Sequence, residues 1–109
     1  MSETRPHRMR MARMLKALSH PMRIWIVEEL ARSGERCVCE LARLSGADDS
    51  TMSRHLTQLR VAGLVTDERR GMQVFCRLSG PAVRQLLEAA QNAAAGTSEP
   101  VRAEWLGVC

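Results

Sequence analysis

No stretch of this 109-residue chain stays apolar over the roughly 18 residues needed to span a membrane. The start of the sequence also lacks a charged segment followed by an apolar one, which is the pattern of a secretory signal. We therefore expect a cytoplasmic protein. In that reducing compartment, the four cysteines are expected to be metal ligands, reactive thiols or core residues rather than a disulfide framework.

Residues that carry catalysis are not grouped anywhere in the sequence. It contains no recognisable Ser/His/Asp set, paired carboxylates, phosphate-binding glycine loop or open three-ligand metal site. A chain of this size also has little room for a substrate pocket. These absences argue against an enzyme and against an obligatory cofactor.

The charge balance favours a polyanionic partner. Sixteen Lys and Arg residues against twelve Asp and Glu residues give a net charge of +4, and fifteen of the sixteen cations are Arg. The forked guanidinium of Arg suits phosphates and guanine edges. The composition is therefore compatible with binding to nucleic acid.

Hydrophobic periodicity predicts a mainly α chain with one small β-hairpin. We expect five helices and two strands. The first helix covers residues 8–18, and the second runs from the Ser19-His20-Pro21 start signal to Ser33-Gly34. The other helices cover residues 39–46, 50–61 and 81–95, and the strands cover residues 64–70 and 72–78. The third and fourth helices have the outline of a helix-turn-helix, and the hairpin after them stands where a wing belongs. The predicted fold is a winged helix-turn-helix in the order α-α-α-α-β-β-α. Residues 1–95 would form one DNA-binding and dimerisation domain, followed by a C-terminal tail over residues 96–109.

Apolar stripes near both ends of this region predict a homodimer. The stripes comprise Met11, Leu15 and Leu18 in the first helix and Leu86, Leu87 and Ala90 in the last. Together they present more apolar surface than a domain of this size can cover. Pairing the two helices with their copies across a two-fold axis would bury the stripes and set two recognition helices one turn of DNA apart.

Two phrases in this element order carry a resemblance to a known family. They are Lys16-Ala-Leu-Ser-His-Pro-Met-Arg23 and Ser50-Thr-Met-Ser-Arg-His-Leu-Thr-Gln-Leu-Arg-Val-Ala-Gly-Leu-Val65. The chain resembles the ArsR/SmtB family of winged-helix repressors over about residues 10–95. Cys37-Val38-Cys39-Glu40-Leu41 is similar to the metal-binding box of the arsenic-responsive branch, Cys-Val-Cys-Asp-Leu-Cys, with Ala42 in the place of the third cysteine. The resemblance implies a homodimer that binds operator DNA and releases it when As(III) or Sb(III) binds the box, which derepresses detoxification genes.

Cys37 and Cys39 are the candidate metalloid ligands. Soft ions prefer thiolate, and a helix N-terminus beside Arg36 should lower the pKa of both thiols. Residues i and i+2 of a regular helix diverge by about 200° around its axis, so we expect both sulfurs to face one ion only if the first turn is loose or unwinds. That unwinding would couple the ion to the recognition helix. Cys109 is a further candidate, as a third ligand from the same chain or from the partner.

Other interpretations of the cysteines stay open. Cys37 and Cys39 could serve a thiol redox or persulfide sensor on the same scaffold, since oxidants attack accessible thiolates. They could also be small hydrophobic residues that fill a helix junction. Cys76 alternates with Val74 and Leu78 on the inner face of its strand, so we expect it in the core.

The predicted DNA-reading surface is the polar face of the helix over residues 50–61. If Met52, Leu56 and Leu59 point inward, Arg54 and Gln58 can read base edges. The other candidates are Ser50, Thr51, Ser53, His55 and Thr57 on the same helix and Arg69 and Arg70 at the wing tip. Wing cations would contact the minor groove or the DNA backbone. His55 flanks the apolar stripe, where packing and DNA contact are equally open.

Overall fold

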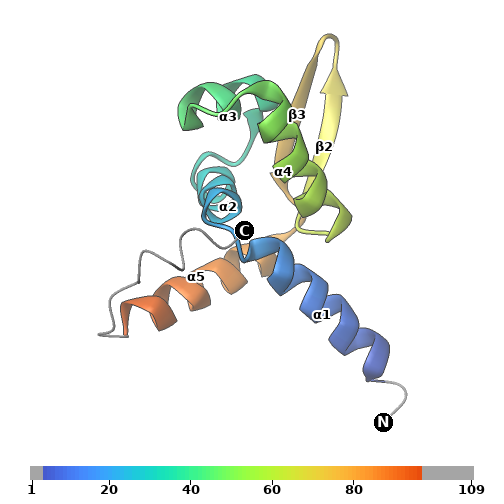
Figure 1. Ribbon diagram of the computed structural model, residues 1–109, viewed down its shortest axis with the longest axis vertical. Helices are drawn as coiled ribbons and strands as arrows, with labels where there is room; N and C mark the ends of the chain where they lie inside the picture. The colour runs from blue at the N-terminus through green and yellow to red at the C-terminus, as the bar shows by residue number, and fades with distance from the viewer. Residues whose placement is uncertain (1–3, 97–109) are drawn as a thin grey trace.

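The structure of the protein is a computed structural model that describes residues 4–96. Within these residues it contains five helices and three strands (Figure 1). The helices are α1 (Arg5–Leu18), α2 (Pro21–Ser33), α3 (Val38–Ser45), α4 (Asp49–Val61) and α5 (Pro81–Ala95), and the strands are β1 (Arg36–Cys37), β2 (Val65–Arg70) and β3 (Gln73–Leu78). The predicted winged helix-turn-helix is confirmed. Two differences are that α1 begins three residues earlier than expected and that β1 precedes α3.

Capping residues set the helix ends around the helix-turn-helix. The His20 ring caps α2, because its Nδ1 accepts a hydrogen bond from the backbone N–H of Met22 at 3.1 Å. The Asp48 carboxylate caps α4 in the same way. Gly46 ends α3 with a φ of 77°, a conformation that favours glycine. The turn between α3 and α4 is therefore short and well defined.

The strands form one antiparallel sheet in the order β1-β3-β2. β2 and β3 make the wing, and their pairing runs from Val65 opposite Leu78 to Arg70 opposite Gln73. β1 adds a third strand along the other edge of β3, with Cys37 opposite Phe75. The sheet therefore has one strand more than the expected hairpin. The sequence did not predict β1, because a strand of two residues is too short to show a period of two.

The core lies where α2, α3 and α4 pack against the base of the wing. Its most buried large side chains are Ile26, Leu30, Leu41, Met52, Leu59 and Leu64. Cys76 belongs to the same core with 1% of its surface exposed, which confirms its predicted place. Burial raises the pKa of the Cys76 thiol to about 11. This thiol therefore stays protonated at neutral pH.

Helices α1 and α5 extend away from that core (Figure 1). On α1, Met11 and Leu15 are 47% and 54% exposed, so nothing within residues 4–96 covers these two members of the predicted stripe, whereas Leu18 packs partly buried against the core. On α5 the prediction is wrong for Leu87, which is buried in the core of its own chain, whereas Ala90 is exposed. None of the helices within residues 4–96 is long and apolar enough to cross a membrane.

Candidate functional site

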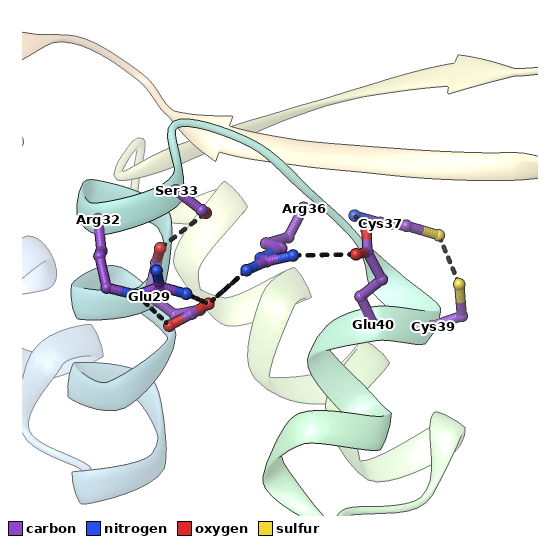
Figure 2. A network of polar contacts seen from close by, with 7 residues as sticks. All are labelled: Glu29, Arg32, Ser33, Arg36, Cys37, Cys39 and Glu40. Carbon is purple, nitrogen blue, oxygen red and sulfur yellow. Dashed lines mark hydrogen bonds and ion pairs between the residues drawn. The ribbon is translucent and has the colours of Figure 1, made fainter.

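The two cysteines of the box are in direct contact at the start of α3. Cys37 is the N-cap residue, with extended backbone angles (φ −67°, ψ 145°), and Cys39 lies in the first turn. Their Sγ atoms are 2.7 Å apart (Figure 2). The sulfurs meet without unwinding of α3, at a loose helix start, because an N-cap residue lies outside the helix and does not follow its 100° step per residue.

The two thiols differ in environment. Cys37 is buried, with 4% of its surface exposed, and Cys39 is exposed. The pKa of Cys39 is raised, first by its hydrogen bond with Cys37 and then by the loss of some solvation of its sulfur. The expectation that the helix N-terminus lowers the pKa of both thiols is therefore wrong for Cys39, since a shared hydrogen bond favours the protonated sulfur.

A chain of ion pairs holds the box in this geometry (Figure 2). The Glu40 carboxylate accepts a hydrogen bond from the backbone N–H of Cys37 at 3.0 Å, which is the reaching-back contact of a capping box. Arg36 pairs with Glu40 at 3.0 Å and with Glu29 of α2 at 3.1 Å. The hydrogen bond from the Cys37 backbone N–H and, after it, the ion pair with Arg36 lower the pKa of Glu40 below its ordinary value. Sequence reasoning missed this role of Glu40, although a glutamate three residues after an N-cap is its usual signal.

The box offers two sulfur ligands and no more among the described residues. Within residues 4–96, no three His, Cys, Asp or Glu side chains gather closely enough to hold a metal ion. Cys109, the predicted source of a third sulfur, lies outside the described residues, as does the tail from residue 97 on.

Helix α4 presents the predicted DNA-reading residues on one face. Met52, Leu56 and Leu59 are buried as expected. The exposed candidates are Ser50, Ser53, Arg54, Thr57 and Gln58, and Thr51 is half-buried among them. The structure thus brings these six side chains together on the surface of the second helix of the helix-turn-helix.

His55 is engaged inside the protein. It accepts a hydrogen bond at its Nδ1 from Nε of Arg23 at 3.2 Å, and its ring centroid lies 4.6 Å from that of His20. Burial, His20 and Arg23, in that order, lower the pKa of His55. These contacts give the half-buried His55 a packing role, and its contact with DNA stays a prediction.

The two wing arginines are not equivalent. Arg70 pairs with Glu35 at 2.7 Å and with Glu68 at 2.6 Å, and its guanidinium lies 4.6 Å from the centre of the Phe75 ring. Arg69 makes one 3.3 Å hydrogen bond to the Gly71 carbonyl. Of the two, Arg69 has the guanidinium that is not neutralised by a carboxylate in the described structure.

A helix-turn-helix with a polar outer face and an adjacent wing defines a winged helix-turn-helix regulator. Residues 20–67 match the family described as "Bacterial regulatory protein, arsR family". The chain belongs to the ArsR family. Its relatives are transcriptional regulators rather than enzymes.

Individual relatives support this assignment. The chain is 37% identical over 91 residues to the arsenic resistance transcriptional regulator ArsR1 of Pseudomonas putida, covering 84% of this chain and 67% of that one. It is 35% identical over 82 residues to a cadmium resistance transcriptional regulatory protein CadC homolog of Staphylococcus aureus, covering 75% and 68%. The NMR structure of the homodimeric winged helix-turn-helix DNA-binding domain Mb0332 of Mycobacterium bovis matches with a TM-score of 0.84 at 29% identity, covering 94% of each chain.

Proposed function

We propose that the chain is a homodimeric repressor that binds operator DNA and releases it when As(III) or Sb(III) binds Cys37 and Cys39, which derepresses detoxification genes. The observation that carries the proposal is the 2.7 Å contact between the two Sγ atoms. Two adjacent thiols suit a thiophilic ion, because the side chains are already in place and binding costs little conformational entropy. A relative with the words arsenic resistance in its name supports the choice of ion.

The number of sulfurs favours a trivalent metalloid over a tetrahedral metal. Zinc takes four ligands, or three with a water, and within residues 4–96 the box supplies two sulfurs with no third ligand nearby. Trivalent arsenic and antimony form three bonds, so two thiolates leave one position for a hydroxide, an organic group or another sulfur. Cys109 stays a candidate for that sulfur.

The DNA-binding side of the proposal rests on α4 and the wing. In the dimer, α1 of one protomer would cover the exposed Met11 and Leu15 of the other. Arg54 and Gln58 would then read bases in the major groove, and Arg69 would contact the DNA backbone or the minor groove. We assign both DNA binding and dimerisation to residues 1–95, with residues 96–109 as a tail.

The position of the box supplies a route from the ion to the DNA. Cys37 is part of β1, which pairs with β3 of the wing. Cys39 is part of α3, which packs on α4. An ion bound to both sulfurs could therefore shift the wing, through β1, and the recognition helix α4, through α3. Thermodynamic linkage requires that DNA binding weaken ion binding by the same factor.

A thiol redox or persulfide sensor is the second candidate function. The sulfur contact and the exposure of Cys39 also favour oxidation of the pair to a disulfide or a related product. The two functions differ in what they require. Capture of As(III) needs no oxidant, whereas the redox response does.

The test is release of a fluorescent promoter fragment from reduced protein, followed by anisotropy under strictly anaerobic conditions. As(III) should release the DNA from wild type but not from Cys37→Ser or Cys39→Ser, and Cys76→Ala serves as the control outside the box. If Cys109→Ser also fails to respond, the tail supplies the third ligand. If wild type ignores As(III) and responds to oxidant, the redox function replaces the proposal.

A further inference from the structure

A pocket of about 390 Å³ opens beside the two sulfurs of the box. Its lining comes from the box (Cys37, Val38 and Cys39), from α4 and from the wing. An apolar cavity of about 150 Å³ is enough to bind benzene in a protein core. The pocket therefore has room for a substituent of aromatic-ring size attached to an atom held by the sulfurs.

The lining of the pocket suits an uncharged occupant that has an apolar part. Val38, Leu56 and Val74 contribute apolar surface. The one cation of the lining, Arg60, is paired with Asp67 at 2.9 Å, and this ion pair joins α4 to β2. With Asp49 as a further carboxylate at the pocket, an anionic ligand would be repelled.

The valence of arsenic also favours an organic ligand at this site. Trivalent arsenic bound to Cys37 and Cys39 has one bond left. Cys76 also lines the pocket, but it belongs to the core, and the three cysteines do not form a ligand cluster. No side chain within residues 4–96 fills the third position on arsenic, which leaves it open to a group that the ligand carries.

We propose that this pocket holds the organic substituent of a monosubstituted trivalent arsenical, with an apolar group of about aromatic-ring size on the arsenic. The inference rests on the proposed function and names the ligand class of the same site. Binding would be a condensation: R–As(OH)₂ and two thiols give R–As(S–Cys)₂ and two waters. Two As–O bonds break, two As–S bonds form, each thiol proton leaves in a water, and arsenic stays trivalent.

The place of the pocket gives the occupant a direct effect on DNA binding. Ser53 and Thr57, on the DNA-reading face of α4, line the pocket together with Val74 of the wing. A ring between them would separate the two elements that contact DNA. The substituent is therefore expected to increase DNA release beyond what the arsenic atom causes through the sulfurs.

The test compares phenylarsonous acid with methylarsonous acid, since both need two thiols and only one fills the pocket. Affinities are measured on the full chain by competition with a dithiol-reactive fluorophore. A peptide over residues 35–41 serves as the control, because it has the same two cysteines without the pocket. The full chain should prefer the phenyl compound by about tenfold more than the peptide does, as burial of a ring predicts.

Filling the pocket should remove that preference. Val74→Phe should weaken binding of the phenyl compound about tenfold and leave the methyl compound within about twofold. Val61→Phe, on the 77% exposed end of α4, is the matched control and should change neither affinity. Val38→Phe replaces Val74→Phe if the latter does not fold, as judged by circular dichroism and DNA binding.

The outcomes separate this inference from the proposed function. If the full chain and the peptide show the same preference, or if Val74→Phe weakens both arsenicals equally, the pocket is not the binding site of the substituent. Arsenite would still release DNA in that case. If neither arsenical binds through Cys37 and Cys39, and arsenite does not release DNA, both proposals are overturned.

Discussion

Arg70 and Glu35 form a two-pronged ion pair, with Nη1–Oε1 and Nη2–Oε2 distances of 2.7 and 2.8 Å. Glu35 immediately precedes β1, so the pair fastens the outer strand of the wing to the segment that carries Cys37. β1 also pairs with β3 at Phe75, the residue under the Arg70 guanidinium. The wing is therefore tied to the box at two points.

This pairing predicts different roles for the two wing arginines. Each phosphate contact adds about one unit to the slope of log affinity against log salt concentration. Arg69→Ala should reduce that slope by about one, because Arg69 is free to contact phosphate. Arg70→Ala should leave the slope unchanged and lower the melting temperature slightly, because Arg70 positions the wing. A loss of slope in Arg70→Ala would assign Arg70 to DNA instead.

The pKa of Cys39 predicts how the box reacts with an alkylating agent. A raised pKa means that less thiolate is present at a given pH, so Cys39 should react more slowly at pH 8 than an ordinary exposed cysteine. Cys37→Ala removes the hydrogen bond that contributes most to the shift and should speed the reaction of Cys39 at that pH. Peptide mass spectrometry after timed iodoacetamide treatment measures this, and buried Cys76 provides the unreactive reference. Equal rates in both proteins would contradict the assigned cause.

Glu40 should matter for both stability and response. Glu40→Ala removes the acceptor for the Cys37 backbone N–H and one partner of Arg36. The start of α3 should loosen, lowering the melting temperature by a few degrees and weakening As(III) binding. Glu88→Ala, at an exposed carboxylate of α5, is the control for loss of charge. Unchanged As(III) affinity in Glu40→Ala would show that the sulfurs need no such support.

The exposed face of α1 predicts the effect of a charge on assembly. Leu15→Glu places a carboxylate on the apolar stripe and should shift the protein from dimer to monomer in sedimentation analysis. Arg13→Glu, on the opposite face, is a larger change of charge and should leave the dimer intact. A dimeric Leu15→Glu variant would place the interface elsewhere.

Local signals made most of the fold predictable. Glycine and proline at helix ends and the apolar spacing of α4 placed the helix-turn-helix, and alternation placed β3. β1 could not be predicted, because two residues show no period. The ion pair between Glu35 and Arg70 could not be predicted from the sequence either, since no local rule relates residues 35 positions apart.

The cysteine pair shows where reasoning from helical geometry stopped. The 200° divergence applies to two residues within a helix, and Cys37 is not within one. The expected start of α3 at residue 39 and the observed start at Val38 both leave Cys37 outside the helix, so the divergence never applied to this pair. The residue types therefore indicated the site, whereas its geometry depends on the extended backbone of Cys37.

The contact between the sulfurs also affects how fast the protein can respond. Had the first turn of α3 been required to unwind, each capture of an ion would wait for a segment to open and would compete with its reclosing. With the sulfurs already adjacent, Cys37 before the helix and Cys39 in its first turn, the proposed switch needs no such opening, and its delay would be set by ligand exchange at arsenic and by the lifetime of the DNA complex.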